Sequence, residues 1–158
     1  MFRSGRFVAE HVEPVEACQV QPNGVDIGLD RVERPTGGGS IGIDGKSIGG
    51  RRTHEPEDGR YTLEPGSYIV GYAERIAVPE GHVGFILPRS SLLRNGATLH
   101  TAVWDTGYEG RGEGLLTVGA RLGIDDGARI GQFVLAGADH RGRYDGTYQG
   151  EGLDGADR

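Results

Sequence analysis

Short apolar runs separated by turn residues extend along most of this chain, and this alternation predicts β-strands. Strands at this spacing are typical of an all-β sandwich, barrel or jelly roll. A helical signal is found only at the start, where Ser4 to Glu16 can form a short helical turn before Pro14 intervenes. The pattern therefore predicts an all-β fold with a short N-terminal helical turn. Its expected strands fall at residues 24–29, 68–72, 74–78, 82–87, 115–118 and 128–135.

Two stretches lie outside this alternation. Residues 34–59 are rich in glycine, proline and charge, and predict a long surface loop with room for a small hairpin. Residues 139–158 have little apolar content, so we expect them to be flexible in the free protein. No shift in composition indicates a second domain. We therefore expect one β domain over residues 1–138, followed by a flexible C-terminal segment over residues 139–158.

The composition narrows the class of protein. At 158 residues, the chain has the size of a single domain. No stretch approaches the ~20 apolar residues of a transmembrane helix, and the N-terminus lacks the apolar region of a signal peptide. Cys18 is the single cysteine, which excludes an internal disulfide and agrees with a reducing compartment. These features predict a cytoplasmic protein without a membrane partner.

Charge and cysteine count also exclude two kinds of function. The formal net charge of -6 argues against a general nucleic-acid binder, which would carry a basic surface. One cysteine is too few for a zinc-dependent base deaminase, whose metal is held by two or three thiolates or by histidine with two cysteines. Glycine is unusually frequent, at 30 of 158 residues against a usual ~7%. The glycines fall between the apolar runs, where chain reversals need them.

A first candidate for chemistry is the segment Pro88–Gly96, which follows an apolar run and contains Arg89, Ser90 and Ser91 side by side. A guanidinium group matches phosphate oxygens in a bidentate manner, and hydroxyl and backbone N–H donors can complete a phosphate-binding cradle. An ordinary strand-to-helix junction, with Ser90 as the N-cap, explains the same residues. Spacing alone leaves both interpretations open.

A second candidate is the segment Thr101–Gly110, where Asp105 lies between an apolar run and a turn, with Tyr108 after it. A carboxylate at a hairpin tip can activate a water molecule. Asp and Gly also form plain Asx-turns, so this segment taken alone fits a structural turn as well.

Three further segments complete the set: Gln21–Asp30, Gly127–Leu135 and Tyr144–Gly152. In this order, over nearly the whole chain, the five segments resemble the dUTPase and dCTP deaminase superfamily, and most of all its archaeal dUTPase-like proteins. The most specific match is Pro88–Leu92 followed by Asp105–Gly110. The tail Tyr148-Gln149-Gly150 is more similar to the deaminase branch. The resemblance implies a distorted jelly roll or β-barrel that assembles as a homotrimer with shared active sites.

The resemblance assigns the chemical step to the segment Thr101–Gly110. The carboxylate of Asp105 would orient and deprotonate the attacking water. The ring of Tyr108 would lie against the deoxyribose and leave no room for a 2′-hydroxyl, so ribonucleotides would be refused. The backbone N–H and C=O groups around Ala102 and Val103 would read the edge of the pyrimidine.

The other segments would hold the triphosphate, partly from neighbouring subunits, and the resemblance assigns this task to Arg89, Ser90, Ser91 and Gln132. Mg²⁺ would sit mainly on the phosphates, with Asp26 holding it through a water, as suits an ion that keeps several of its waters. Tyr148 and Gln149 would belong to a C-terminal lid that folds over the triphosphate and excludes bulk water.

The implied activity is hydrolysis of dUTP to dUMP and pyrophosphate by Mg²⁺-assisted attack of water at the α-phosphorus. Deamination of dCTP, alone or combined with dUTP hydrolysis, occurs in the same superfamily. Deaminases share the arginine that matches Arg94, but their catalytic glutamate falls at Leu115 here, and leucine cannot transfer a proton. Glu113 lies two residues earlier on the same strand face, and a bulge between Gly112 and Gly114 would bring it near the base.

Base preference is the property that the sequence specifies least. The stretch His100–Asp105 is one residue shorter than its counterpart in the bifunctional enzymes, so the hairpin that reads the base differs in register. A non-catalytic nucleotide-binding regulator would use the same phosphate cradle. Asp105 argues against a regulator, because a carboxylate beside a triphosphate repels it and a binding protein has no need of one there.

Overall fold

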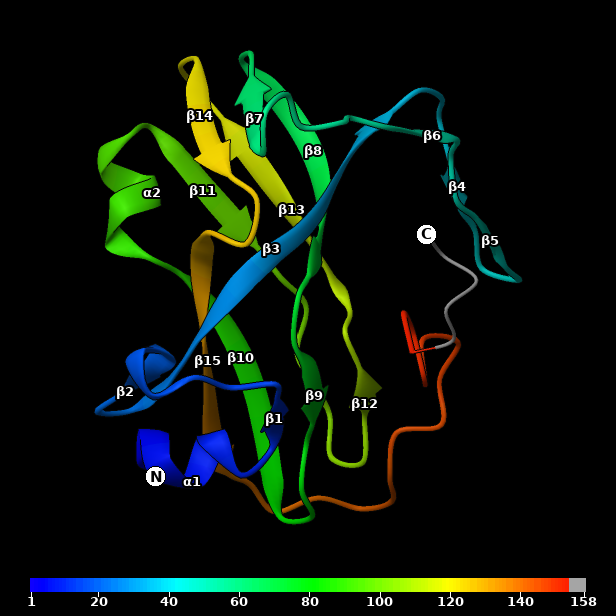
Figure 1. The fold of residues 1–158 in the computed structure, drawn as a ribbon. Coiled ribbons are helices and arrows are strands. Elements are labelled where there is room, and N and C mark those ends of the chain that lie inside the picture. The colour runs from blue at the N-terminus through cyan, green and yellow to red at the C-terminus, as the bar shows by residue number, and fades with distance from the viewer. Residues whose placement is uncertain (154–158) are drawn as a thin grey trace.

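The structure, a computed structural model, describes residues 1–153, and its longest strand organises the fold (Figure 1). β3 (Gly24–Pro35) has antiparallel partners on both sides, and its residues from Gly24 to Leu29 are all buried. The eight-stranded main sheet runs in the order β10-β15-β3-β8-β13-β11, with β2 and β6 paired to opposite ends of β3. Its other strands are β2 (Val20–Gln21), β6 (Arg51–Thr53), β8 (Gly66–Tyr72), β10 (His82–Pro88), β11 (Ala97–His100), β13 (Glu113–Val118) and β15 (Arg129–Gly137).

Smaller elements surround the main sheet. One three-stranded sheet has the order β1-β9-β12, and two two-stranded sheets join β7 to β14 and β4 to β5. Their strands are β1 (Val12–Glu13), β4 (Ser40–Ile41), β5 (Lys46–Ser47), β7 (Arg60–Leu63), β9 (Arg75–Ala77), β12 (Glu109–Gly110) and β14 (Leu122–Asp125). The helical elements are α1 (Gly5–Ala9), the 3₁₀ turn η1 (Ala17–Gln19) and α2 (Ser90–Arg94). Within residues 1–153, no helix has the length and apolar character needed to cross a membrane.

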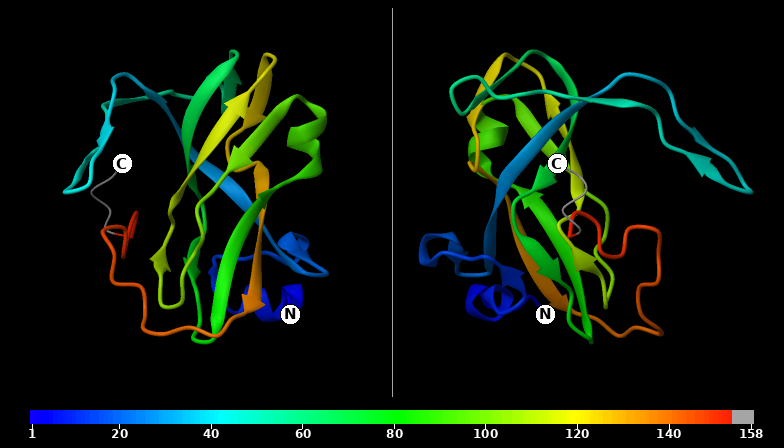
Figure 2. Two further views of the ribbon diagram at one scale, coloured as in Figure 1. Left: turned by 180° about the vertical axis from the view of Figure 1, so that it is seen from behind. Right: turned by 45° about the vertical axis from the view of Figure 1, so that its right-hand side comes forward.

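The main sheet curls until its edge strands β10 and β11 approach each other, which produces a nearly closed barrel (Figures 1 and 2). Strand alternation decides which side chains fill this barrel. Along β13, Gly114, Leu116 and Val118 are buried, whereas Glu113 and Leu115 face outward. The largest fully buried side chains include Tyr68, Tyr72, Phe133, Ile27, Leu29 and Leu135. The all-β prediction of a distorted jelly-roll or barrel type is confirmed.

The expected strands are present with adjusted bounds. The run at 24–29 is the buried first half of β3, and the run at 128–135 corresponds to β15. The predicted N-terminal helical turn is α1, where the Ser4 side chain accepts a hydrogen bond from the Phe7 N–H. The short strands β7 and β14 were not predicted, because two such segments are stabilised by pairing across a long separation in sequence.

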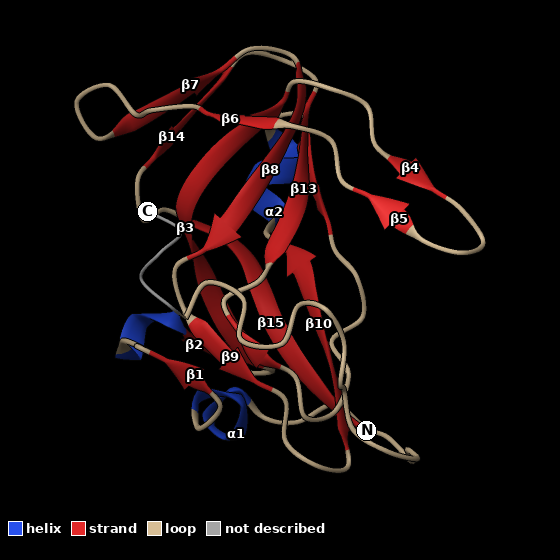
Figure 3. Cartoon of the chain, turned by 90° about the vertical axis from the view of Figure 1, so that its right-hand side faces the viewer, coloured by secondary structure: helices blue, strands red, loops and turns tan. Residues whose placement is uncertain are grey.

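Two segments lie together on one side of the barrel. Within the predicted loop 34–59, β4 and β5 form the expected small hairpin, which projects away from the barrel. Residues 139–153 run along the same side (Figures 1 and 2). Seen from that side, these residues pass in front of the barrel and α2 lies behind it (Figure 3). The predicted C-terminal segment extends to residue 158, and its last part, 154–158, lies outside the described residues.

Candidate active site

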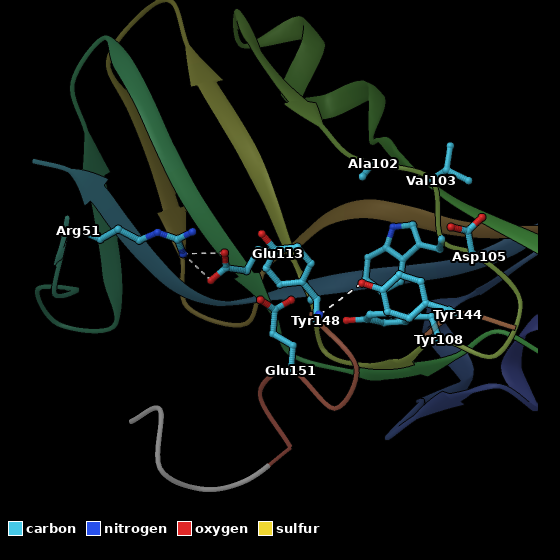
Figure 4. Close-up of a pocket in the computed structure, with 11 residues that line it drawn as sticks. Arg51, Ala102, Val103, Asp105, Tyr108, Glu113, Tyr144, Tyr148 and Glu151 are labelled. Atoms are coloured by element: carbon cyan, nitrogen blue, oxygen red, sulfur yellow. Dashed lines mark hydrogen bonds and ion pairs between the residues drawn. The ribbon is translucent and has the colours of Figure 1, made fainter. Parts of the chain in front are cut away.

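A pocket of about 300 Å³ opens beside the turn that carries Asp105 (Figure 4). The loop between β11 and β12 forms one wall, and the C-terminal segment forms another. Part of the predicted site lines this pocket, namely Ala102, Val103, Asp105, Tyr108 and Tyr148. The structure adds Arg51, Trp104, Gly112, Glu113, Tyr144 and Glu151 to the lining. The catalytic, sugar and base-reading candidates therefore share one cavity within a single chain.

The turn that carries Asp105 is held from behind by buried neighbours. The Tyr108 N–H donates to the Asp105 carbonyl at 3.1 Å, and Gly107, at a φ of 83°, supplies the left-handed backbone that the turn needs. Thr106 is buried, and its hydroxyl donates to the Pro79 carbonyl at 3.0 Å. The Asp105 side chain itself is exposed, so a fixed backbone presents an accessible carboxylate to the pocket.

Trp104 joins this turn to the main sheet. It forms an isolated antiparallel bridge with Gly84 of β10, in which the Gly84 N–H donates to the Trp104 carbonyl at 2.8 Å and the Trp104 N–H donates back at 3.0 Å. The indole ring meets the Tyr108 ring edge to face, with centroids 4.8 Å apart. A Cβ atom on Gly112 would come within 2.4 Å of the indole, so only glycine fits there. The aromatic wall of the pocket is therefore tightly packed.

Tyr108 presents its ring to the pocket while its hydroxyl is buried. Among residues 1–153, its hydroxyl and that of Tyr72 find no hydrogen-bond partner. Burial raises the pKa of Tyr108, and the nearby Glu151, Tyr144 and Glu113 raise it further, so the phenol stays protonated at neutral pH. A neutral aromatic face suits contact with a sugar, as the predicted role requires.

Glu113 reaches the pocket without the bulge that the sequence suggested. Its pairing with Gly71 and the pairing of Leu115 with Ile69 follow one regular register. The Glu113 carboxylate accepts a hydrogen bond from Arg31 at 2.6 Å, and two from Arg51 at 2.6 and 2.8 Å. Both of its oxygens are thus engaged by guanidinium groups, which stabilise the charged carboxylate.

A second group of predicted residues surrounds Asp26, whose side chain is buried. Arg89 and Arg129 each approach its Oδ2 at 3.4 Å, and Gln132 donates to its Oδ1 at 3.3 Å. The two cations compensate the buried charge, and Asp26 in turn orients Arg89. Arg89, Gln132 and Asp26 therefore form one cluster, and none of them lines the Asp105 pocket.

Ser90 and Ser91 begin α2 with exposed side chains. The suggestion that Ser90 is the N-cap is wrong, because Arg89 occupies that position and no side-chain capping hydrogen bond forms. The two hydroxyl groups are thus not used by the helix as caps. The helix α2 itself lies on the side of the barrel opposite to the C-terminal segment (Figure 3).

The C-terminal segment is fastened to the Asp105 turn. Gln149 donates to the Gly107 carbonyl at 3.1 Å and accepts from the Glu109 N–H at 3.3 Å. The Tyr144 ring packs against the Tyr108 ring, with centroids 5.5 Å apart. Tyr148 lines the pocket (Figure 4). Gln149 therefore contacts the turn rather than the pocket, and Tyr148 provides the part of the segment that a bound nucleotide would meet.

The described residues do not form a Mg²⁺ cage. Within residues 1–153, no three His, Cys, Asp or Glu side chains lie close enough to hold a metal ion. The carboxylate of Asp26 is already beside two guanidinium groups, which repel a cation. This donor set fits Mg²⁺ only when the ion is carried by the phosphates of a nucleotide and keeps most of its waters.

Arg51 and Tyr144 are two of the lining residues that were given no role from the sequence. Arg51 lies in the long loop, and its contact with Glu113 joins positions 62 residues apart, for which the local sequence holds no signal. Tyr144 had a weak signal, as an aromatic residue in an otherwise polar tail. Such residues in a segment with little apolar content are candidates for contact with the barrel.

The sequence of this chain is similar to those of known proteins. The model of the dCTP deaminase-like family matches residues 3–138. A probable deoxyuridine 5′-triphosphate nucleotidohydrolase of Halobacterium salinarum is 52% identical over 160 residues, which cover 98% of this chain and 97% of the relative. A protein of the same name from Aeropyrum pernix is 42% identical over 138 residues, which cover 85% of this chain and 87% of the relative.

A solved structure shares the fold. The 2′-deoxycytidine 5′-triphosphate deaminase from Agrobacterium tumefaciens matches with a TM-score of 0.59 at 19% identity, over 85% of this chain and 47% of the deaminase. At this identity, the similarity shows the fold alone. The match of the family model and the identity to the archaeal relatives lead to one conclusion: the chain belongs to the dCTP deaminase-like family.

Proposed function

We infer that this protein hydrolyses dUTP to dUMP and pyrophosphate. The observation that carries the inference is the pocket that Asp105 and Tyr108 both line, in a chain 52% identical to a probable deoxyuridine 5′-triphosphate nucleotidohydrolase. Removal of dUTP would protect the deoxynucleotide pool and supply the dUMP from which dTTP precursors are made. We propose that the protein performs this task in the cytoplasm.

In the proposed reaction, Asp105 accepts a proton from a water molecule as the water oxygen bonds to the α-phosphorus. The bond from that phosphorus to the oxygen bridging it to the β-phosphorus breaks, and pyrophosphate leaves. Tyr108 packs against the deoxyribose and excludes a 2′-hydroxyl. The backbone of Ala102 and Val103, which lies outside the strands, reads the pyrimidine. Tyr148 covers the bound nucleotide from the C-terminal segment.

The phosphates are held by a different group, and its position supports a homotrimer with shared sites. Arg89, Ser90, Ser91 and Gln132 do not line the Asp105 pocket of their own chain. In a closed threefold ring, the Arg89 cluster of one subunit would face the Asp105 pocket of the next. Asp26 would hold the Mg²⁺ of a Mg²⁺–dUTP substrate through a water, and the ion would neutralise charge on the phosphates.

Deamination of dCTP is the second candidate, because Glu113 lies in the same pocket. A deaminase glutamate must take up and release protons. Here both oxygens of Glu113 are bound to Arg31 and Arg51, and the position of the deaminase glutamate is occupied by Leu115. Hydrolysis is therefore the function that the site supports better.

One experiment separates the two reactions and tests both. The purified protein is incubated with Mg²⁺ and either dUTP or dCTP, and pyrophosphate and ammonia are measured. We expect pyrophosphate from dUTP and no ammonia from dCTP. Ammonia from dCTP would assign a deaminase. Neither product, in a protein that binds the nucleotide in a separate binding measurement, would assign a regulator.

A further inference from the structure

The hairpin that projects from the barrel has no evident role in the fold. This arm, residues 36–50, contains β4 and β5 and is almost wholly exposed. Ile41 and Ile43, for example, are 94% and 104% exposed. The arm nevertheless descends toward the C-terminal segment, as two views show (Figures 1 and 2). A segment that buries little apolar surface contributes little to stability. The contacts that the arm makes where it meets the C-terminal segment therefore point to a role in function.

The contact at the far end is made by Lys46, the single lysine of the chain. Its ammonium group donates to the Tyr148 hydroxyl at 3.2 Å and lies 4.5 Å from the centre of the Tyr148 ring. One cation thus binds both the polar and the aromatic part of one side chain. Lys46 does not line the pocket, but Tyr148 does.

The near end of the arm is fixed at one end of the same pocket. Arg51 follows the arm directly and bonds to Glu113 at 2.6 and 2.8 Å and to Glu33 at 3.4 Å. Although burial opposes it, these carboxylates raise the pKa of Arg51, so the cation is stable there. Figure 4 shows Arg51 and Glu113 at one end of the pocket, Asp105 at the other, and Tyr148 between them.

We propose that the arm positions the C-terminal segment over the substrate, with Lys46 as the positioning residue that holds Tyr148 against the pocket. The segment is attached to the Asp105 turn by Gln149 on one side, and Lys46 secures it from the other. This proposal rests on the proposed function, because Tyr148 is there the residue that covers the nucleotide. Lys46 acts through Tyr148 and takes no part in the chemical step.

The expected effect is on binding rather than on turnover. An exposed cation–π contact is worth about a two- to fivefold change in an equilibrium constant. Lys46→Ala should therefore raise KM for dUTP about two- to fivefold and leave kcat unchanged. Lys46→Arg should restore most of the affinity, because a guanidinium group also stacks on an aromatic ring. The matched control is Asp44→Ala, an exposed charge at the tip of the same hairpin, which should leave KM unchanged.

A double-mutant cycle tests whether Lys46 works through Tyr148. In a Tyr148→Ala background, Lys46→Ala should add nothing to KM. An unchanged KM for Lys46→Ala alone, or an equal further increase in the Tyr148→Ala background, would overturn the proposal.

A second measurement does not depend on catalysis. Chymotrypsin cleaves after tyrosine, and its cut at Tyr148 in the folded protein reports how firmly the segment is held. Lys46→Ala should speed this cut about two- to fivefold without nucleotide, and Asp44→Ala should not. Equal rates for wild type and Lys46→Ala would reject the contact. Faster cleavage in a protein that fails to hydrolyse dUTP would reject the proposed function and keep the contact.

Discussion

The backbone N–H of Tyr108 donates to the carbonyl of Asp105 at 3.1 Å, so the proposed base and the proposed sugar gate belong to one turn. Both side chains therefore project from the same hydrogen-bonded backbone. Chemical attack and sugar recognition are thus coupled through a backbone that Gly107 and the buried Thr106 keep rigid. Substitutions of the side chains alone should separate the two roles, because they leave that backbone intact.

Asp105→Asn should abolish dUTP hydrolysis, because an amide cannot accept the proton of the attacking water. We expect kcat to fall by roughly 10²- to 10⁴-fold. Binding of a non-hydrolysable dUTP analogue should stay nearly unchanged, as followed by the fluorescence of Trp104, the single tryptophan, which lines the pocket. Asp126→Asn, at an exposed position, is the control. A variant at Asp105 with normal turnover would remove the base from the mechanism.

Tyr108→Ala should allow UTP to compete with dUTP, because the ring that excludes the 2′-hydroxyl is gone. Tyr108→Phe keeps the ring and removes a hydroxyl group that has no hydrogen-bond partner among residues 1–153. The phenylalanine variant should discriminate as the wild type does. The measurement is the ratio of kcat/KM for dUTP to that for UTP. Equal ratios in all three proteins would show that the gate lies elsewhere.

Deletion of the residues after Gly142 should slow hydrolysis and leave the barrel folded. The deletion removes Tyr144, Tyr148 and Gln149, and with them the cover that excludes bulk water from the pocket. We expect a loss of about tenfold or more in kcat/KM. Thermal unfolding should change little, because the core residues all precede the deletion. If the shortened enzyme works at full speed, the lid has no catalytic role.

Mixing two inactive variants tests whether sites are shared between subunits. Asp105→Asn keeps the Arg89 cluster, and Arg89→Ala keeps the Asp105 pocket. After the two are unfolded together and refolded as a mixture, about one quarter of the sites in random trimers would combine an intact half from each neighbour. We expect about a quarter of wild-type activity from an equal mixture, measured as pyrophosphate release. A mixture as inactive as its components would place both halves in one chain.

Glu74 should make stability depend on pH. It is buried, and its carboxylate accepts hydrogen bonds from Gln19 at 2.6 Å and from the Gly28 N–H at 2.9 Å. Burial raises the pKa of Glu74, although these hydrogen bonds oppose the change. A carboxyl group with a raised pKa contributes most to stability below its unfolded-state value of about 4.3. That contribution is lost as the pH rises through the folded-state pKa.

The stability advantage of the wild type over Glu74→Gln should therefore shrink as the pH rises above the unfolded-state value of about 4.3. The measurement is the free energy of unfolding in urea at a series of pH values. Glu57→Gln, at an exposed position, should show no such trend. An advantage that grows with pH would mean that the hydrogen bonds outweigh the burial of Glu74.

The sequence was sufficient to predict the fold class, and it named part of the pocket lining. Apolar runs such as 82–87 and 128–135 alternate with turns, and this alternation predicts strands without knowledge of which strands pair. Asp105 and Tyr108 share a short segment, so their proximity follows from local order. The resemblance assigned Arg89 and Gln132 to the phosphates and Asp26 to Mg²⁺, but their cluster was not predicted, since pairing between distant strands brings these residues together.

The rest depended on contacts between distant segments. Arg51 meets Glu113 and Lys46 meets Tyr148 only because the long loop folds back toward the pocket, and no residue pattern within that loop records either partner. Ser90 was a plausible cap by its type, but Arg89 takes that position. The bulge suggested for Glu113 was unnecessary, because regular pairing with β8 already directs it to the pocket.

The bridge between Gly84 and Trp104 has a consequence for the assembled protein. β10 pairs with Trp104, next to Asp105, through Gly84, and Arg89 follows the other end of the same strand. If Asp105 and Arg89 of one chain serve different sites of a ring, each β10 connects two neighbouring active sites. A substitution in the middle of this strand, such as at Ile86, would then disturb water activation in one site and phosphate binding in the next.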